Sequence, residues 1–129
     1  MQPQEWEIVL YKTESGASPV EAFILGLPTK EQVKMYRTIK LLEELGTQIR
    51  MPHARAIEGE DNLFELRSQQ GGNIQRIFYF HWTGATFVLL HGFTKKTQKT
   101  PRKELGIAKA RQRDYLTRLE DYGHVKKTE

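Results

Sequence analysis

The chain has 129 residues, of which 38% are hydrophobic, 28% are charged and none is cysteine, a composition typical of a single globular domain over residues 1–129. The lack of cysteine excludes disulfides and thiolate metal sites. No apolar run approaches the roughly 20 residues of a membrane span, and the first residues lack a secretory pattern, so we expect a soluble, cytoplasmic protein.

The formal net charge of +4 is unevenly distributed along the chain. Residues 1–61 hold seven Lys and Arg against ten Asp and Glu, and residues 62–129 hold thirteen against six, so the two parts carry −3 and +7. Between residues 62 and 103, seven basic residues accompany one acid, Glu65. Such a concentration of positive charge favours a polyanionic partner, and the alternative is a solvated basic face without a specific ligand.

The N-terminal part predicts a strand followed by a short helix. Residues 5–12 alternate between polar and apolar side chains as a strand does. After a turn, Ser18 is placed to cap a helix whose first residue is Pro19, and Gly26 and Pro28 end it.

A longer helix is predicted between Thr29, as its cap, and Gly46, as its stop. Its apolar residues recur at helical spacing and predict one buried face. They are Met35, Ile39, Leu42 and Leu45. Residues 47–61 lose this periodicity and are expected to form a loop.

Three strand-like runs follow, over residues 62–69, 73–82 and 85–95, separated by the turn dipeptides GG and TG. A last helix is predicted from Pro101, with Leu105, Ala108, Tyr115, Leu119 and Tyr122 along one stripe. The order predicts an α+β fold with an N-terminal strand, two helices, a three-stranded antiparallel meander and a C-terminal helix, the helices covering one face of the sheet.

Two-residue turns would set the register of the meander. A turn at Gly71 and Gly72 places Arg67 opposite Arg76, and a second two-residue turn, at residues 83 and 84, places Arg76 opposite His91. One face would then be apolar, with Phe64, Leu66, Ile77, Tyr79, Val88 and Leu90. If either turn has three residues, the face assignments reverse.

The predicted row of Arg67, Arg76 and His91 indicates an anion site. Two arginines directly opposite each other repel, whereas an anion held between their guanidinium groups would make the pair favourable. Lys95 and Lys96, at the end of the last strand, lie within reach of the same face. The row and the two lysines therefore predict a phosphate-sized site.

Other interpretations of these residues stay open. Arg76 could instead pair with Glu65, diagonal to it on the same face. The aromatic residues Phe78, Phe80, Phe87 and Phe93 could stack on bases, or could pack under the first strand or the last helix. The four histidines show no metal-ligand spacing, and no carboxylate pair suggests two-metal chemistry.

The segments LFELR, QRIFYF and FVLLHGFTKKTQKTPRKELGIAKAR, preceded by a helical pair, resemble the RelE/ParE superfamily of bacterial toxins in its phage-derived HigB-like branch. The resemblance covers roughly residues 5–119. It implies a RelE-like fold and a ribosome-dependent messenger RNA endonuclease that works without a metal or other cofactor. It also implies a helix-turn-helix antitoxin as partner, the toxin being a monomer alone or part of a heteromeric complex.

The resemblance implies that basic side chains hold the scissile phosphate. They match Arg67, Arg76, Lys95 and Lys96, with Lys99, Arg102 and Lys103 expected to bind RNA around them. His91 is the candidate general base, because it lies in the predicted row and can titrate near neutrality. The chain has no tyrosine in the stretch after the last strand, where some relatives place one beside the site. A ParE-like inhibitor of a protein such as gyrase, or an inactive phage-derived nucleic-acid-binding homologue, is the alternative.

Overall fold

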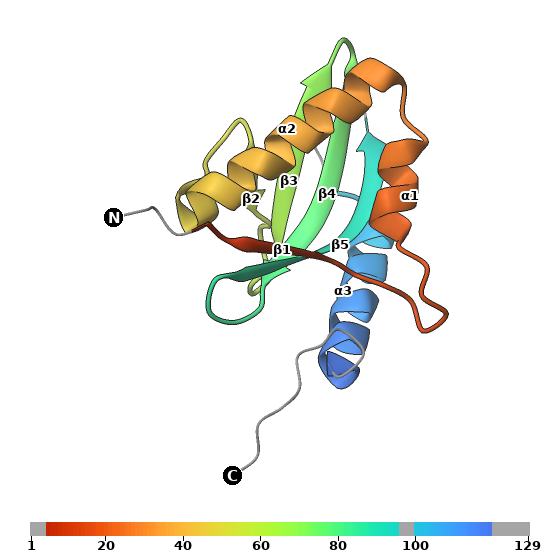
Figure 1. The fold of residues 1–129 in the computed structure, drawn as a ribbon, viewed down its shortest axis with the longest axis vertical. Coiled ribbons are helices and arrows are strands. Elements are labelled where there is room, and N and C mark those ends of the chain that lie inside the picture. The colour runs from red at the N-terminus through yellow and green to blue at the C-terminus, as the bar shows by residue number, and fades with distance from the viewer. Residues whose placement is uncertain (1–4, 96–99, 120–129) are drawn as a thin grey trace.

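The computed structural model describes residues 5–95 and 100–119. It has an α+β fold with a five-stranded mixed sheet and three α-helices (Figure 1). In chain order the elements are β1 (Glu7–Leu10), α1 (Pro19–Leu25), α2 (Thr29–Leu45), the 3-10 turn η1 (Gly46–Gln48), β2 (Ala54–Ala56), β3 (Phe64–Gln70), β4 (Asn73–His81), β5 (Thr86–Lys95) and α3 (Arg102–Thr117).

The strands lie in the order β1-β5-β4-β3-β2, with β1 parallel to β5 and all other neighbours antiparallel. The expected meander is therefore present as β3, β4 and β5, and each of its edges carries one further strand. Strand β2 was predicted as loop, because a three-residue run is too short to show a period of two.

The helices cover both faces of the sheet, so the expectation that they share one face was wrong. Helices α1 and α2 cross the front of the sheet in Figure 1, and α3 lies behind it. The two faces bury separate apolar clusters. The first joins α1 and α2 to the sheet through Val20, Ile24, Met35, Leu42, Leu66, Ile77, Tyr79 and Leu89. The second joins α3 to it through Phe78, Phe80, Val88, Leu90, Phe93, Ala108 and Tyr115.

The predicted ends of the first two helices are confirmed, with small shifts in position. Ser18 caps α1 by accepting a hydrogen bond from the Glu21 backbone N–H. Helix α2 starts at Thr29 itself, behind Pro28, and ends at Gly46. Gly46 has a φ of +58°, and a Cβ there would lie 1.9 Å from the Trp6 indole nitrogen. Only glycine allows both this turn and the close approach of the indole ring.

The predicted register is confirmed between β3 and β4 and wrong between β4 and β5. Arg67 lies opposite Arg76, whereas the partner of Arg76 on β5 is Phe93, and His91 lies opposite Phe78. Two irregularities cause the difference. The Trp82 N–H bonds to the Thr86 carbonyl, which closes a three-residue turn, and a bulge at Phe78/Tyr79 shifts the ladder once more.

The new register changes which aromatic and aliphatic side chains share a face. Val88 and Leu90, expected beside helices α1 and α2, pack with α3 instead. Phe87 was expected on the arginine face and packs with α1 and α2. Phe78, Phe80 and Phe93 are buried under α3, so the interpretation of these three as core residues is confirmed.

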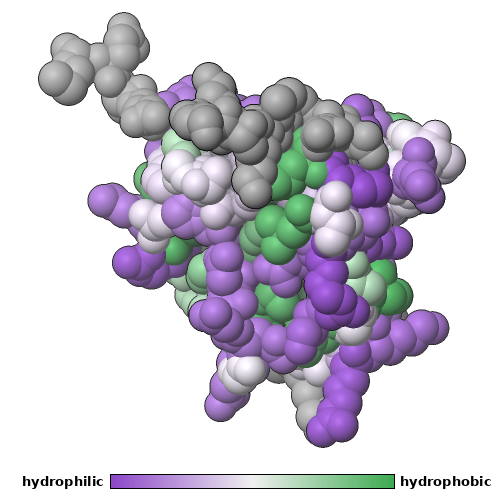
Figure 2. Space-filling model, turned by 90° about the horizontal axis from the view of Figure 1, so that it is seen from below, coloured by the Kyte–Doolittle hydropathy of each residue, from purple (hydrophilic) through white to green (hydrophobic). Residues whose placement is uncertain are grey.

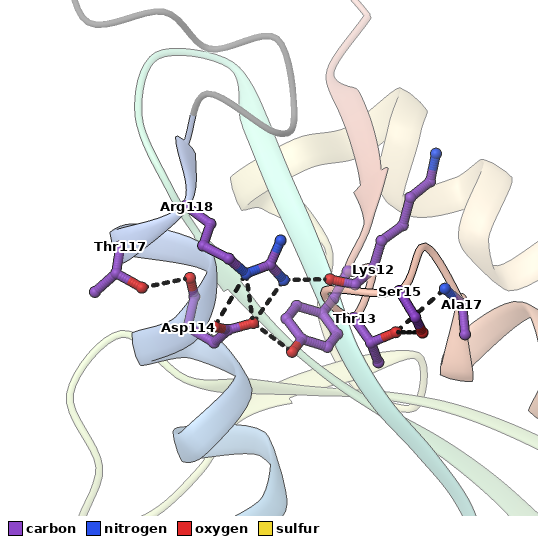
Figure 3. Close-up of polar contacts among 8 residues, drawn as sticks. Lys12, Thr13, Ser15, Ala17, Asp114, Thr117 and Arg118 are labelled. Atoms are coloured by element: carbon purple, nitrogen blue, oxygen red, sulfur yellow. Dashed lines mark hydrogen bonds and ion pairs between the residues drawn. The ribbon is translucent and has the colours of Figure 1, made fainter.

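A polar cluster ties the C-terminal end of α3 to the segment after β1 (Figure 3). The Tyr11 hydroxyl donates to Asp114 at 2.6 Å. Arg118 donates to the same carboxylate at 2.6 Å and to the Lys12 carbonyl at 2.6 Å. Hydrogen bonds from Arg118 and then from Tyr11 lower the pKa of Asp114 below its ordinary value. The cluster therefore holds α3 against the sheet with an ionised carboxylate.

The described residues contain no helix long and apolar enough to cross a membrane. On the face seen in Figure 2, hydrophilic side chains form most of the described surface, and hydrophobic ones show as small separate patches.

Candidate functional site

Three arginines surround one carboxylate on the α3 side of the sheet, and we call this set the arginine cluster: Arg55, Arg67, Arg76 and Glu65. Arg67 Nε lies 3.2 Å and Arg76 Nε 3.4 Å from the same oxygen of Glu65. Arg55 Nη2 lies 3.6 Å from the other oxygen. The interpretation that Arg76 pairs with Glu65 is therefore confirmed.

The cluster follows from strand register. Arg55 lies opposite Glu65 across β2 and β3, and Arg67 lies opposite Arg76 across β3 and β4. Residues two apart in a strand share a face, and so do directly opposed residues. The alternating pattern of β3 and β4 thus places all four side chains on one face, around a single acid.

Burial divides the cluster into an inner and an outer part. Glu65 and Arg76 have no exposed side-chain surface, whereas the Arg67 and Arg55 side chains are 10% and 34% exposed. Burial lowers the pKa of Arg76, and Glu65 opposes this effect. The four side chains together carry a formal charge of +2, and the outer arginines are the ones that an anion can reach in this conformation.

His91 lies on the same face but does not contact the arginine cluster. Its ring stacks on Phe93 with centroids 5.7 Å apart. Nε2 lies 2.5 Å from a Glu104 carboxylate oxygen, and Nδ1 lies 3.0 Å from Arg111 Nη1. These contacts fasten the start and middle of α3 to β5.

The contact with Arg111 assigns the roles of the two ring nitrogens. Because a guanidinium group can only donate hydrogen bonds, Nδ1 of His91 must accept, and Nε2 carries the proton donated to Glu104. Neutral His91 therefore has no free lone pair in this arrangement. It could act as a general base only after Arg111 moved away.

The other predicted basic residues are spread around the end of β5. Lys95 lies opposite Ile74, two residues along β4 from Arg76, and is partly exposed. Arg102 and Lys103 are exposed in the first turn of α3. Lys96 and Lys99 lie outside the described residues.

Sequence reasoning missed three members of this region. Arg55 was assigned to the loop over residues 47–61, and Glu104 was given no role. Arg111 appeared only as the last residue of the longest segment that resembles the toxin superfamily, and in the structure it donates to the Leu90 carbonyl and to His91 Nδ1 on β5. No group of three or more His, Asp or Glu in residues 5–95 and 100–119 is placed to hold a metal ion.

Comparison with known proteins gives one family. The profile of the family described as phage-derived protein Gp49-like (DUF891) matches residues 22–113. This segment runs from α1 to the last part of α3 and includes the whole arginine cluster and the contacts of His91. No curated protein matches the chain. Because the profile covers more than half of the sequence, the protein belongs to the phage-derived Gp49-like family.

Proposed function

We propose that this protein is the toxin of a type II toxin–antitoxin system, with a RelE-like fold of the HigB branch, and that it cleaves messenger RNA on the ribosome. Its Gp49-like, phage-derived family supports a toxin-like role. So do the order of its elements and the motif that ends β5 and begins α3. The single observation that carries the proposal is the arginine cluster, because its charge and its outer arginines suit a phosphate.

In the proposed reaction a ribose 2′-oxygen attacks the adjacent phosphorus as its proton passes to an acceptor. The P–O5′ bond breaks and the departing 5′-oxygen takes up a proton from solvent, leaving a 2′,3′-cyclic phosphate and a 5′-hydroxyl end. Negative charge grows on the phosphoryl oxygens, and fixed cations stabilise it. Arg67 and Arg55 are the groups that would do so, and Lys95, on β5 two strands away from Arg67, would add to the positive charge.

The buried pair of Glu65 and Arg76 has a supporting role in this proposal. It holds Arg67 through the shared carboxylate oxygen, so that its guanidinium group is already positioned when the phosphate arrives. The proton acceptor in this proposal is a group of the ribosomal RNA, and His91 would take this part only if Arg111 released its ring. No metal or other cofactor enters the proposed reaction.

The proposed partner is an antitoxin with a helix-turn-helix domain. An acidic or amphipathic segment of it would cover part of the basic region and keep the cytoplasmic toxin off the ribosome. Opposite charges should make the rate of association fall as salt rises.

A second function is favoured by two observations. Arg76 is completely buried, and both ring nitrogens of His91 are engaged, so both residues have structural contacts. A ParE-like inhibitor that binds a protein such as gyrase would need neither residue for chemistry.

Mapping RNA 5′ ends after controlled expression separates the two functions. For the endonuclease we expect new 5′-hydroxyl ends within translated messages, lost in Arg67→Gln but retained in Lys40→Gln, whose lysine lies on α2. Growth arrest without new RNA ends would support the protein-binding inhibitor. Absence of arrest with well-folded protein would refute both toxin functions.

A further inference from the structure

A second basic surface lies on the other side of the molecule from α3. A groove of about 820 Å³ is lined by residues of α2, by the last residues of β3, and by Pro52 and His53. It exists because β2 is only three residues long and pairs with Phe64–Leu66. The last residues of β3 pair with β4 on one edge, and on the other edge β2 does not extend to them.

One wall of the groove is a row of cations on α2. Lys30, Lys34 and Arg37 all line it and all are exposed. Their spacing of four and then three residues places them on one face of the helix. The row extends about 10 Å along the helix axis, from the rise of about 1.5 Å per residue.

The three cations are not used in ion pairs within the part of the chain that the structure describes. No Asp or Glu lines the groove. Lys40, one turn further along α2, is different, because it pairs with Glu43 at 3.2 Å and with Glu5 at 3.8 Å. The row is thus a concentration of positive charge in the half of the chain whose net charge is negative.

The opposite wall is polar and leads to the arginine cluster. Gln69 and Gln70 line it and are exposed, and their amide groups can donate and accept hydrogen bonds. Arg67 also lines the groove, and the same side chain binds Glu65 in the cluster. An extended anion in the groove would therefore have one end at Arg67.

We propose that this groove binds the phosphodiester backbone of single-stranded RNA and guides the strand to Arg67. The inference rests on the proposed function and names a binding site for its substrate. A row of about 10 Å corresponds to about three nucleotides at the rise of about 3.4 Å per nucleotide of a stacked strand. The amide groups of Gln69 and Gln70 opposite the row suit ribose 2′-hydroxyls.

The test measures binding of a 12-nucleotide oligouridine to the full-length protein by fluorescence anisotropy over a range of salt concentrations. The variant is Lys30→Gln, Lys34→Gln, Arg37→Gln, and the matched control is Lys40→Gln on the same helix. Loss of three phosphate contacts should lower the salt slope of log K by about 2, at about 0.7 per contact for a single strand, and weaken binding by about tenfold or more. The control should match the wild type.

Two outcomes would overturn the inference. One is a triple variant with the affinity and salt slope of the wild type. The other is oligoglutamate binding that is lost in the triple variant while RNA binding is kept, because the groove would then be a site for an acidic peptide. Because the three cations are exposed, the variant should unfold at the temperature of the wild type, and circular dichroism checks this.

The outcome for the groove is separate from the outcome for the proposed function. If messages are cut but RNA binding does not depend on the α2 cations, the groove inference fails and the endonuclease stands. If the cations bind RNA and no message is cut, the endonuclease fails and the groove remains an RNA site.

Discussion

Glu65→Gln should destabilise the protein far more than removal of a surface carboxylate. Glu65 is the only acid of the arginine cluster, and its side chain is fully buried beside Arg76, which is also fully buried. Glutamine keeps the volume of the side chain, so the change removes charge without opening a cavity. The repulsion of Arg76 by Arg67 and Arg55 would then be unopposed by the carboxylate.

The expected loss follows from the burial of these groups. Removing one partner of a buried ion pair costs about 3–5 kcal/mol. We expect about 3 kcal/mol, since Arg67 and Arg55 reach solvent and water screens part of the repulsion. Small domains have a total stability of about 5–15 kcal/mol, so the variant would remain folded at room temperature but with little margin.

Urea denaturation followed by circular dichroism measures the effect. With a slope of about 1–3 kcal/mol/M, a loss of about 3 kcal/mol moves the midpoint by about 1–3 M. The matched control is Glu43→Gln, which removes a carboxylate from a more exposed pair with Lys40 and should cost no more than about 1 kcal/mol. Equal midpoints for the two variants would refute the reasoning that the buried carboxylate holds the cluster together.

Three further predictions concern the candidate base, the contacts of α3 and the end of α2. His91→Gln should keep single-turnover cleavage on programmed ribosomes within about tenfold of the wild type, because both ring nitrogens are engaged; a loss of 10²-fold or more, the range for a general base, would show that Arg111 releases the ring. Asp114→Asn should be less stable than the wild type at pH 7 in urea denaturation. The pKa of Asp114 is lowered in the folded protein, so its contribution is present above its ordinary value of 3.8 and lost as pH falls below it; a difference that persists unchanged at pH 2.5 would contradict this. Gly46→Ala should lower the thermal midpoint by an amount equivalent to about 2 kcal/mol or more, because it combines a positive φ with overlap on Trp6, and an unchanged midpoint would disprove it.

The sequence by itself determined the features that depend on neighbouring residues. Ser18 and Pro19 begin α1, and Gly46 ends α2, because caps act through hydrogen bonds and backbone angles within one turn. The opposition of Arg67 and Arg76 was also predictable, since the tight turn between β3 and β4 sets their register. The α+β class follows from the same alternation, whereas the pairing of Arg76 with Glu65 was one of two interpretations that the sequence left open.

Only the tertiary structure decided which side chains meet across longer distances. No local signal in the sequence shows that the turn before β5 has three residues and not two, or that a bulge lies at Phe78/Tyr79. Each of these shifts the pairing by one residue, and a shift by one residue moves every side chain of the strand to the opposite face. His91 consequently faces Arg111 and Glu104 of α3 and not Arg76. The face that α3 covers depends on which apolar surface remains after α1 and α2 have packed, and this is a property of the whole sheet and not of any segment.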